Sequence, residues 1–263
     1  MEPKKSLGQH WLKDQATLES IVKLAGLTKT DTVLEIGPGL GDLTKLLLEK
    51  AEQVTAVEVD KELAAKLRQK LNLPQLRVVA GDILEFDLWQ LPVGYKVVAN
   101  IPYYLTSNLI RLLSEAANPP SLAVLLVQQE VAERVAAKPG AMSLLSVSAQ
   151  LYSSVELGPV VKAELFEPPP KVDSQVIVLK HRSQPLFENL DEKTFFRIVK
   201  AGFAGRRKKL RSSLAAGLRI GKAEADQLLK SAEIDGDLRA QNLSLQDWQQ
   251  LYIAAQSTNM KVL

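Results

Sequence analysis

The stretch that decides the fold is Thr32-Val33-Leu34-Glu35-Ile36-Gly37-Pro38-Gly39-Leu40-Gly41. Its first half is a short apolar run with β-branched residues, which predicts a buried β-strand. Its second half is rich in glycine, which lets the backbone adopt positive φ and approach a ligand closely. Residues 41–50 then show the apolar spacing of a helix, so the stretch predicts a strand, a tight turn and a helix.

Strand-like and helix-like segments alternate on both sides of this stretch. We expect amphipathic helices at 14–25 and 61–71, and further strands at 53–58, 76–80, 96–99 and 122–128. This alternation predicts βαβ units in a doubly wound, mostly parallel sheet, which is the Rossmann-like α/β fold. Two β-rich runs, at 152–155 and 175–179, are expected to close the sheet as an antiparallel hairpin.

The last third of the chain has a different character. From Asp191 onward the pattern becomes helical and basic. A chain of 263 residues suits one large domain and one smaller one. We therefore expect an α/β domain at 1–185, with a ligand site at the carboxyl ends of its strands, and a small helical domain at 186–263.

The composition excludes several kinds of chemistry. The chain contains no cysteine, which excludes disulfides, thiolate metal sites and a cysteine nucleophile. It also excludes methylation at C5 of a pyrimidine, because that reaction normally needs a thiolate that adds to the ring. No apolar run approaches the roughly 18 residues of a membrane span, and no signal peptide is visible. We expect a soluble, cytoplasmic protein with no metal and no membrane partner, most simply a monomer.

The glycine turn and the strand after it predict a nucleoside site. The turn contains Gly37 and Gly39, but the third glycine of a dinucleotide fingerprint would fall at Asp42. This shift disfavours a pyrophosphate cradle, although the turn alone leaves an NAD site or a purely structural turn open. Glu58 ends the next strand, where a carboxylate can accept hydrogen bonds from both hydroxyls of a ribose.

A third feature follows the third expected strand. Asp82 can accept the amino group of an adenine while Ile83 packs on the ring face. Each of the three features, taken alone, also fits an ordinary turn or a solvated acid. At three successive strand ends they resemble the site elements of class I S-adenosylmethionine methyltransferases, and this resemblance implies S-adenosyl-L-methionine as cofactor.

The segment Asn100-Ile101-Pro102-Tyr103 follows the fourth expected strand and resembles the Asn-Pro-Pro-Tyr type motif of enzymes that methylate amino nitrogens. The exocyclic amine of adenine is a poor nucleophile because its lone pair is delocalised into the ring. The side-chain oxygen of Asn100 and a nearby carbonyl, that of Ile101, can accept both amine hydrogens and direct the lone pair at a methyl donor. Tyr103 can stack on a base held out of its own stack. A plain proline turn capped by asparagine is the other interpretation.

Seven segments together are similar to the KsgA/RsmA family of small-subunit rRNA adenine dimethyltransferases. They are residues 6–12, the glycine turn, Glu58, 81–82, 100–103, 166–174 and 203–214. The resemblance implies that residues 6–12 close over the cofactor, with contacts from Leu12 and from His10, which replaces the usual asparagine. It also implies that Phe166 is a second aromatic wall for the target base, although Phe166 fits a core position equally well.

The substrate is likewise an implication of this resemblance. Members of the family dimethylate the N6 amines of two adjacent adenosines in a hairpin near the 3′ end of 16S rRNA. They do so within an immature small ribosomal subunit, so the resemblance implies rRNA and that assembly intermediate as partners. No spacing or periodicity in the chain carries this information.

One segment of the helical domain carries a concentration of positive charge. Residues 197–222 contain nine Lys or Arg residues and no Asp or Glu, although the net charge of the chain is only +3. A helix is expected there, with Leu210 and Leu214 facing the core. The remaining face would present cations to RNA phosphates: Arg206, Arg207, Lys208, Lys209 and Arg211.

Three other functions remain open or are disfavoured. A large-subunit rRNA adenine methyltransferase of the macrolide-resistance type shares most of the motifs, but the block at 206–214 favours the small-subunit family. A non-catalytic assembly or transcription factor on the same fold would not need Asn100 and Tyr103. An NAD dehydrogenase is disfavoured by Asp42 and by the lack of residues for hydride chemistry.

Overall fold

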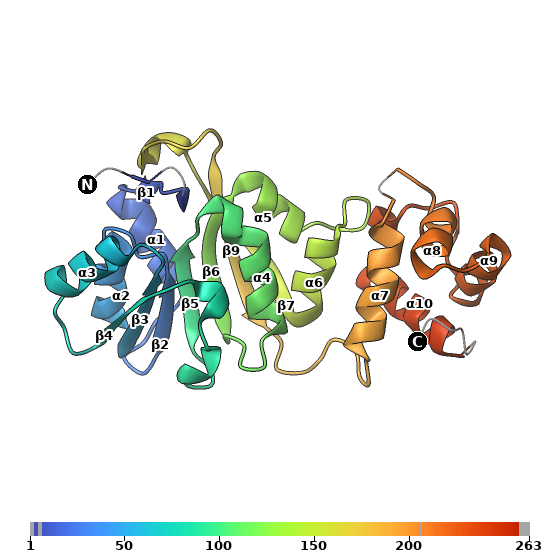
Figure 1. Ribbon diagram of the computed structural model, residues 1–263, viewed down its shortest axis with the longest axis horizontal. Helices are drawn as coiled ribbons and strands as arrows, with labels where there is room; N and C mark the ends of the chain where they lie inside the picture. The colour runs from blue at the N-terminus through green and yellow to red at the C-terminus, as the bar shows by residue number, and fades with distance from the viewer. Residues whose placement is uncertain (1–2, 5–6, 206, 258–263) are drawn as a thin grey trace. The chain divides into compact units, whose positions relative to one another are not determined.

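The computed structural model describes residues 3–4, 7–205 and 207–257. Its main feature is a seven-stranded sheet with the order β4-β3-β2-β5-β6-β9-β7 (Figure 1). Neighbouring strands from β4 to β6 run parallel, and β9 runs antiparallel to both β6 and β7. The strands are β2 (Thr32–Ile36), β3 (Gln53–Glu58), β4 (Leu76–Ala80), β5 (Lys96–Asn100), β6 (Leu122–Gln128), β7 (Ser153–Val161) and β9 (Ser174–His181).

This topology confirms the predicted Rossmann-like α/β class with its mostly parallel sheet. The predicted closing hairpin is present too, with Val155 of β7 opposite Leu179 of β9. Its first strand was placed slightly early, because Tyr152 still belongs to α6 (Leu144–Tyr152) and β7 continues to Val161.

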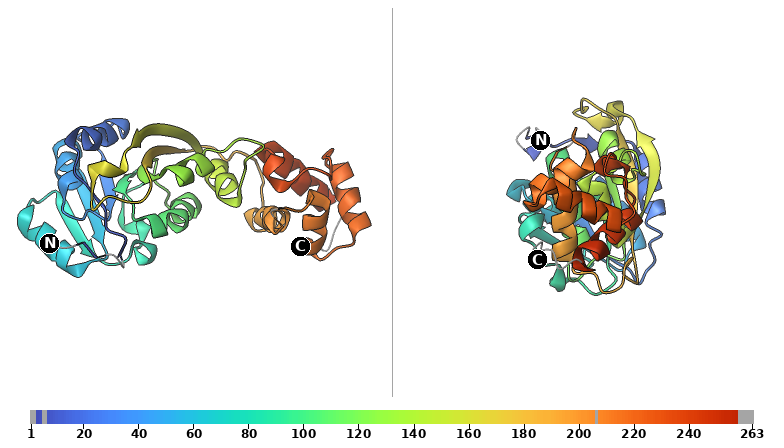
Figure 2. Two further views of the ribbon diagram at one scale, coloured as in Figure 1. Left: turned by 90° about the horizontal axis from the view of Figure 1, so that it is seen from above. Right: turned by 90° about the vertical axis from the view of Figure 1, so that its right-hand side faces the viewer.

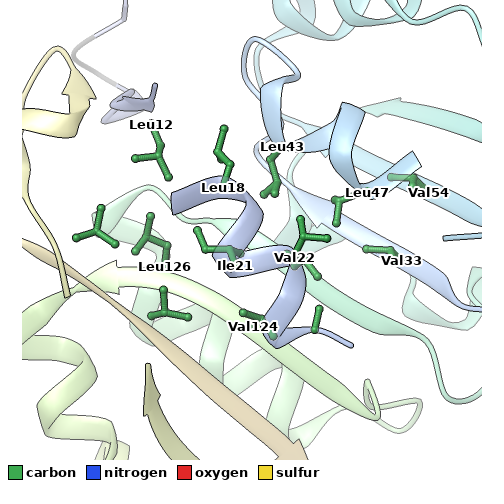
Figure 3. Packing of buried hydrophobic residues seen from close by; sticks show 14 of the residues in the cluster. Leu12, Leu18, Ile21, Val22, Val33, Leu43, Leu47, Val54, Val124 and Leu126 are labelled. Carbon is green, nitrogen blue, oxygen red and sulfur yellow. The ribbon is translucent and has the colours of Figure 1, made fainter. Parts of the chain in front are cut away.

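One face of the sheet buries its apolar side chains under α1 (Gln15–Leu24) and α2 (Asp42–Lys50), as Figure 3 shows. Helix α1 turns Leu18, Ile21 and Val22 inward, the spacing of an amphipathic helix. Full burial of one such side chain stabilises the fold by roughly 1.5–3 kcal/mol. This packing holds α2 against β2 and so fixes the glycine turn between them.

The other face carries α4 (Thr106–Glu115) and α5 (Gln129–Val135), while α3 (Lys61–Lys70) joins β3 to β4 (Figures 1 and 2). Because β2 to β5 are parallel and joined by crossovers, their carboxyl ends lie at the same edge of the sheet. A ligand site formed by several strand ends is therefore expected at that edge. Within the described ranges no helix is both long and apolar enough to cross a membrane.

A small second sheet joins the start of the chain to a distant loop. Strand β1 (Trp11–Leu12) pairs antiparallel with β8 (Phe166–Glu167). The pairing is extended by the backbone N–H of Lys13, which donates to the carbonyl of Leu165 at 3.0 Å. The segment before α1 is therefore fixed next to Phe166.

The chain divides into two compact units. The first comprises Met1–Glu133 and Tyr152–Arg182, and the second comprises Arg134–Leu151 and Ser183–Leu263. The sequence prediction had placed residues 134–151 in the α/β domain. The structure attaches them to the helical unit through Gln241, whose carbonyl accepts hydrogen bonds from the N–H groups of Gly140 at 2.8 Å and Met142 at 3.1 Å.

The helices of the second unit that follow residue 190 form a bundle, orange to red in Figure 2. They are α7 (Glu192–Phe203), α8 (Leu210–Leu218), α9 (Lys222–Ser231) and α10 (Leu245–Ser257). Helices α7 and α8 approach closely at Gly217, where an added Cβ would lie 2.6 Å from Ala201. A larger residue at position 217 would therefore force the two helices apart.

The prediction that the basic block is helical throughout was wrong. Helix α8 begins only at Leu210, and Lys209 before it has extended backbone angles. The N–H of Leu210 donates to the carbonyl of Leu238 at 2.7 Å, and that of Arg211 donates to the carbonyl of Gly236 at 3.3 Å. These partners from a later segment satisfy N–H groups of the first turn, so the helix starts there and residues 207–209 form a connection.

Candidate active site

Most of the predicted site residues line one cleft in the first unit. They are His10, Gly37, Gly39, Glu58, Asp82, Ile83, Asn100, Ile101, Pro102, Tyr103 and Phe166. The cleft lies where β2, β3, β4 and β5 end, which is the edge expected from the parallel order. Leu12 lies outside the cleft, in the hydrophobic core. It lines a smaller neighbouring cavity together with Glu35.

The glycine turn forms one wall of the cleft. Gly39 has a φ of +54°, and an added Cβ there would lie 3.0 Å from the ring of Trp11. Glycine is therefore required at this position both by the backbone conformation and by the close approach of the indole. With no side chain on Gly39, the backbone of the turn stays open to a ligand in the cleft.

Glu58 is the most buried acid in the lining of the cleft, with 4% of its surface exposed. Its two oxygens accept hydrogen bonds from the N–H of Gly39 at 3.1 Å and the N–H of Asp60 at 3.0 Å. Burial raises the pKa of Glu58, and the charge of Asp60 acts in the same direction while the two N–H donors oppose it. Each carboxylate oxygen keeps a lone pair for a hydroxyl of a ligand.

Asn100 ends β5 and presents an acceptor to the cleft. Its Nδ2 donates a hydrogen bond to the backbone carbonyl of His10 at 3.1 Å, which sets the orientation of the amide. The N–H of Ile101 donates to the carbonyl of Leu126 at 3.1 Å and fixes the backbone after the strand. Across the described ranges, neither Oδ1 of Asn100 nor the carbonyl of Ile101 accepts a hydrogen bond. Two acceptors at this strand end are therefore available to a ligand.

Aromatic and imidazole rings also line the cleft. Tyr103 is half-buried, and burial raises the pKa of its phenol, so the hydroxyl is neutral at physiological pH. The rings of Tyr103 and His10 stack with their centroids 5.8 Å apart. Phe166 lines the same cleft but is only 4% exposed and also belongs to the hydrophobic core. Because the core holds its ring in place, Phe166 can contact a ligand without changing its own position.

Two aromatic residues of the cleft were missed by the sequence analysis. Trp11 lines both the cleft and the neighbouring cavity, with the ammonium group of Lys13 6.0 Å from its ring centroid. Tyr104 stands at the rim with 60% of its surface exposed. Trp11 lies inside the segment that carries the family resemblance, so its position was available as a signal. No sequence pattern distinguished Tyr104 from a residue of the following helix.

The predicted RNA-binding cations that the structure describes fall into two groups. Arg207 and Lys208 are exposed and form no ion pair with any described residue. Lys209 instead lies 3.0 Å from Asp237, and Arg211 pairs with Asp237 and, at 3.5 Å, with Asp226. Acids from outside the stretch thus balance two of the five predicted RNA-binding cations. Arg206 lies outside the described residues, as does Ser6 of the family segment.

The chain is similar to known proteins over nearly its whole length. The sequence profile described as "Ribosomal RNA adenine dimethylase" matches residues 1–257. A protein of Dehalococcoides mccartyi (strain ATCC BAA-2100 / JCM 16839 / KCTC 5957 / BAV1) called "Ribosomal RNA small subunit methyltransferase A" is 42% identical over 255 residues, covering 95% of this chain and 88% of that protein. A protein of the same name from Shouchella clausii (strain KSM-K16) is 39% identical, covering 98% of this chain and 91% of its own length.

Two solved structures are also similar to this chain over nearly its whole length. The 23S rRNA methyltransferase ErmE is 31% identical with a TM-score of 0.75, covering 93% of this chain and 98% of that one. A dimethyladenosine transferase from Plasmodium falciparum is 26% identical with a TM-score of 0.82, covering 95% and 98%. The family profile and the curated relatives both extend over nearly the whole chain, second unit included. The chain therefore belongs to the ribosomal RNA adenine dimethylase family.

Proposed function

We propose that this chain uses S-adenosyl-L-methionine to dimethylate the N6 amines of two adjacent adenosines in a 3′-terminal hairpin of 16S rRNA. The reaction would take place in the cytoplasm on an immature small ribosomal subunit. The single observation that supports this most is the pair of unused acceptors, Oδ1 of Asn100 and the carbonyl of Ile101, in a cleft that also contains Glu58.

The residues of the cleft fit the cofactor. Glu58 has lone pairs for the two ribose hydroxyls, and Asp82 and Ile83 line the same cleft near it for the adenine. The bare backbone at Gly37 and Gly39 leaves space for the part of the cofactor beyond the ribose. When bound, S-adenosylmethionine supplies a methyl group on a sulfonium sulfur, which leaves with its bonding electron pair.

The acceptor pair suits an amine better than any other nucleophile on a base. An N6 amine has two hydrogens, and one acceptor for each of them favours a pyramidal nitrogen with a directed lone pair. No general base is needed before attack, because the methylated nitrogen is strongly acidic and loses its proton to water. Catalysis then consists mainly of orientation and preorganised polar groups. Tyr103 and Phe166 are proposed to hold the base out of its own stack.

The helical unit is proposed to bind RNA through its exposed cations. Arg207 and Lys208 have no acidic partner within the described ranges, so they are free to contact phosphates. Arg206, Lys209 and Arg211 were predicted for the same role, but ion pairs with Asp237 and Asp226 weaken the case for Lys209 and Arg211. We therefore rank Arg207 and Lys208 first.

The second candidate is methylation of the large subunit, which the likeness to ErmE keeps open. We favour the small subunit because relatives near 40% identity are called "Ribosomal RNA small subunit methyltransferase A" and match the chain nearly from end to end. ErmE, by comparison, is 31% identical.

One experiment separates the two candidates. The purified chain is incubated with methyl-labelled S-adenosylmethionine and with small or large ribosomal subunits from cells that lack the gene. We expect label in 16S rRNA only, recovered as N6,N6-dimethyladenosine by mass spectrometry. Label in 23S rRNA alone would show that the large subunit is the substrate instead. No label in either rRNA would reject a methyltransferase function.

A further inference from the structure

The phenol of Tyr103 is anchored by a residue that the reaction itself does not require. Its hydroxyl shares a hydrogen bond of 2.8 Å with the hydroxyl of Ser174. Ser174 is fully buried and begins β9, where it lies opposite Gln128 of β6 and Val161 of β7. A serine held between two strands is a rigid anchor, so this bond restricts rotation of the Tyr103 ring.

One face of the same ring is covered. The ring of His10 stacks on Tyr103 at a centroid distance of 5.8 Å and an interplanar angle of 23°. Carbon atoms in contact lie about 3.5–4.0 Å apart, so a third ring between them would need about 7 Å. A base therefore has no room between these two rings, and only the other face of Tyr103 can receive it.

His10 is itself fixed, and it connects Tyr103 to Asn100. Its Nδ1–H donates a hydrogen bond of 2.7 Å to the carbonyl of Pro168 in the loop after β8. Its own carbonyl accepts the Nδ2–H of Asn100 at 3.1 Å. A single residue thus sets both the rotamer of the Asn100 amide and the covered face of Tyr103.

We propose that Ser174 is a positioning residue for methyl transfer. It fixes the plane of Tyr103, with His10 as the backing, so that the target base stacks on the face that His10 does not cover, with its amine at the acceptors of Asn100 and Ile101. This inference rests on the proposed function, because it assumes that Tyr103 receives the base. It adds a residue outside the cleft lining and assigns a task to its hydroxyl.

The test is a double-mutant cycle on the bond between the two hydroxyls. Ser174→Ala and Tyr103→Phe each remove this bond from a different end while keeping the Tyr103 ring position occupied by an aromatic. We expect each variant to lower kcat about tenfold, because small misplacement of a reacting group costs that much or more. The KM for the small subunit and the Kd for S-adenosylmethionine by calorimetry should stay unchanged. The double variant should also lose about tenfold rather than a hundredfold, since both changes remove the same interaction.

A matched control and a readout without chemistry keep the result interpretable. Ser114 is another buried serine of the first unit, on α4 and outside the cleft, and Ser114→Ala should leave kcat unchanged. The flip rate of the Tyr103 ring, measured by NMR on labelled tyrosine, should rise in Ser174→Ala.

Two results would overturn the proposal: an unchanged kcat and ring-flip rate in Ser174→Ala, or losses that multiply in the double variant. If the unmodified chain transfers no methyl group, the proposed function fails instead. The ring-flip comparison then still decides whether Ser174 anchors Tyr103.

Discussion

The cleft of the first unit and the basic segment of the second, residues 207–211, hold their functional side chains in different ways. In the cleft, Glu58 at the end of β3 accepts hydrogen bonds from two backbone N–H groups. One belongs to Asp60, just after the strand, and the other to Gly39 in the glycine turn. In the basic segment, Lys209 and Arg211 are held by Asp237, which is more than 25 positions further along the chain. The first arrangement is built from hydrogen bonds to backbone N–H groups, and the second from ion pairs between charged side chains.

This difference determines how each region responds to change. The cleft combines the buried Glu58 and Phe166 with amide and carbonyl acceptors and aromatic rings, so its work depends on orientation and is sensitive to small displacements. Arg207, Lys208 and Lys209 of the basic segment are exposed and Arg211 is partly exposed, and salt screens interactions between exposed charges. We therefore expect steep, specific losses from changes in the cleft and graded, salt-dependent losses from changes in the basic segment.

The largest effect is expected from Asn100→Ala. The variant loses the Oδ1 acceptor, and loss of one preorganised polar partner costs about a hundred- to a thousandfold in kcat. Binding of small subunits should change little, because that step depends on the second unit in our proposal. Single-turnover methyl transfer measures the first quantity and filter binding the second. An equal loss of methyl transfer and of subunit binding would contradict the proposal that the cleft catalyses the reaction while the second unit binds the RNA.

The next effect concerns the cofactor and pH. Burial raises the pKa of Glu58 above 4.5, and the ionised form is the one that accepts ribose hydroxyls. Affinity for S-adenosylmethionine should therefore be highest above this raised pKa and should fall as pH decreases through it. Glu58→Gln should weaken binding about tenfold or more, the cost of replacing charged hydrogen bonds by neutral ones. The affinity of the Glu58→Gln variant for S-adenosylmethionine should not depend on pH in the region where Glu58 titrates in the unmodified chain.

Calorimetry at a series of pH values from neutral downward tests both statements. Asp82→Asn provides the comparison, because Asp82 lies in the same cleft but is exposed, whereas Glu58 is buried. A wild-type affinity that depends on pH no more than that of Glu58→Gln would contradict the role of ionised Glu58.

The same contrast explains what the sequence could predict. The strands, the glycine turn and the cleft residues at the strand ends follow from periodicity and from the rule that parallel strands end at one edge. Asn100, Glu58 and Asp82 converge because each one ends or follows its own strand. A local pattern is sufficient in such cases.

Other features depend on residues that only the folded chain brings together. The start of α8 at Leu210 is determined by the carbonyls of Leu238 and Gly236, so the periodicity of residues 206–214 alone predicted too long a helix. The attachment of residues 134–151 to the helical unit depends on Gln241, a hundred positions away from Gly140 in sequence. Composition and spacing carry no record of such pairings.

A smaller effect is expected from the free cations of the basic segment. Each phosphate contact contributes about 0.7 to the slope of log K against log salt for single-stranded nucleic acid. The double variant Arg207→Ala/Lys208→Ala should therefore reduce the slope for rRNA binding by about 1.4. Its kcat at saturating subunit should be unchanged. The matched double variant Lys209→Ala/Arg211→Ala should change the slope less and lower Tm more, because these two side chains hold the segment around Asp237. The opposite ranking would show that the ion-paired cations are the ones that bind RNA.

The smallest effect, and the sharpest test of the comparison, is expected from Asp237→Asn. Hydrogen bonding to Lys209, with the charge of Arg211, lowers the pKa of Asp237, so the carboxylate stays ionised at every pH suited to an RNA assay. Mutation rather than acid is therefore needed to release its partners. Freed from Asp237, Lys209 becomes available to phosphate, while Arg211 keeps Asp226. We expect rRNA affinity at low salt to rise two- to threefold and the salt slope to steepen by no more than about 0.7, the contribution of one new contact. Unchanged affinity and slope would mean that Asp237 does not keep Lys209 from RNA, and the basic segment would then act as a single cationic surface.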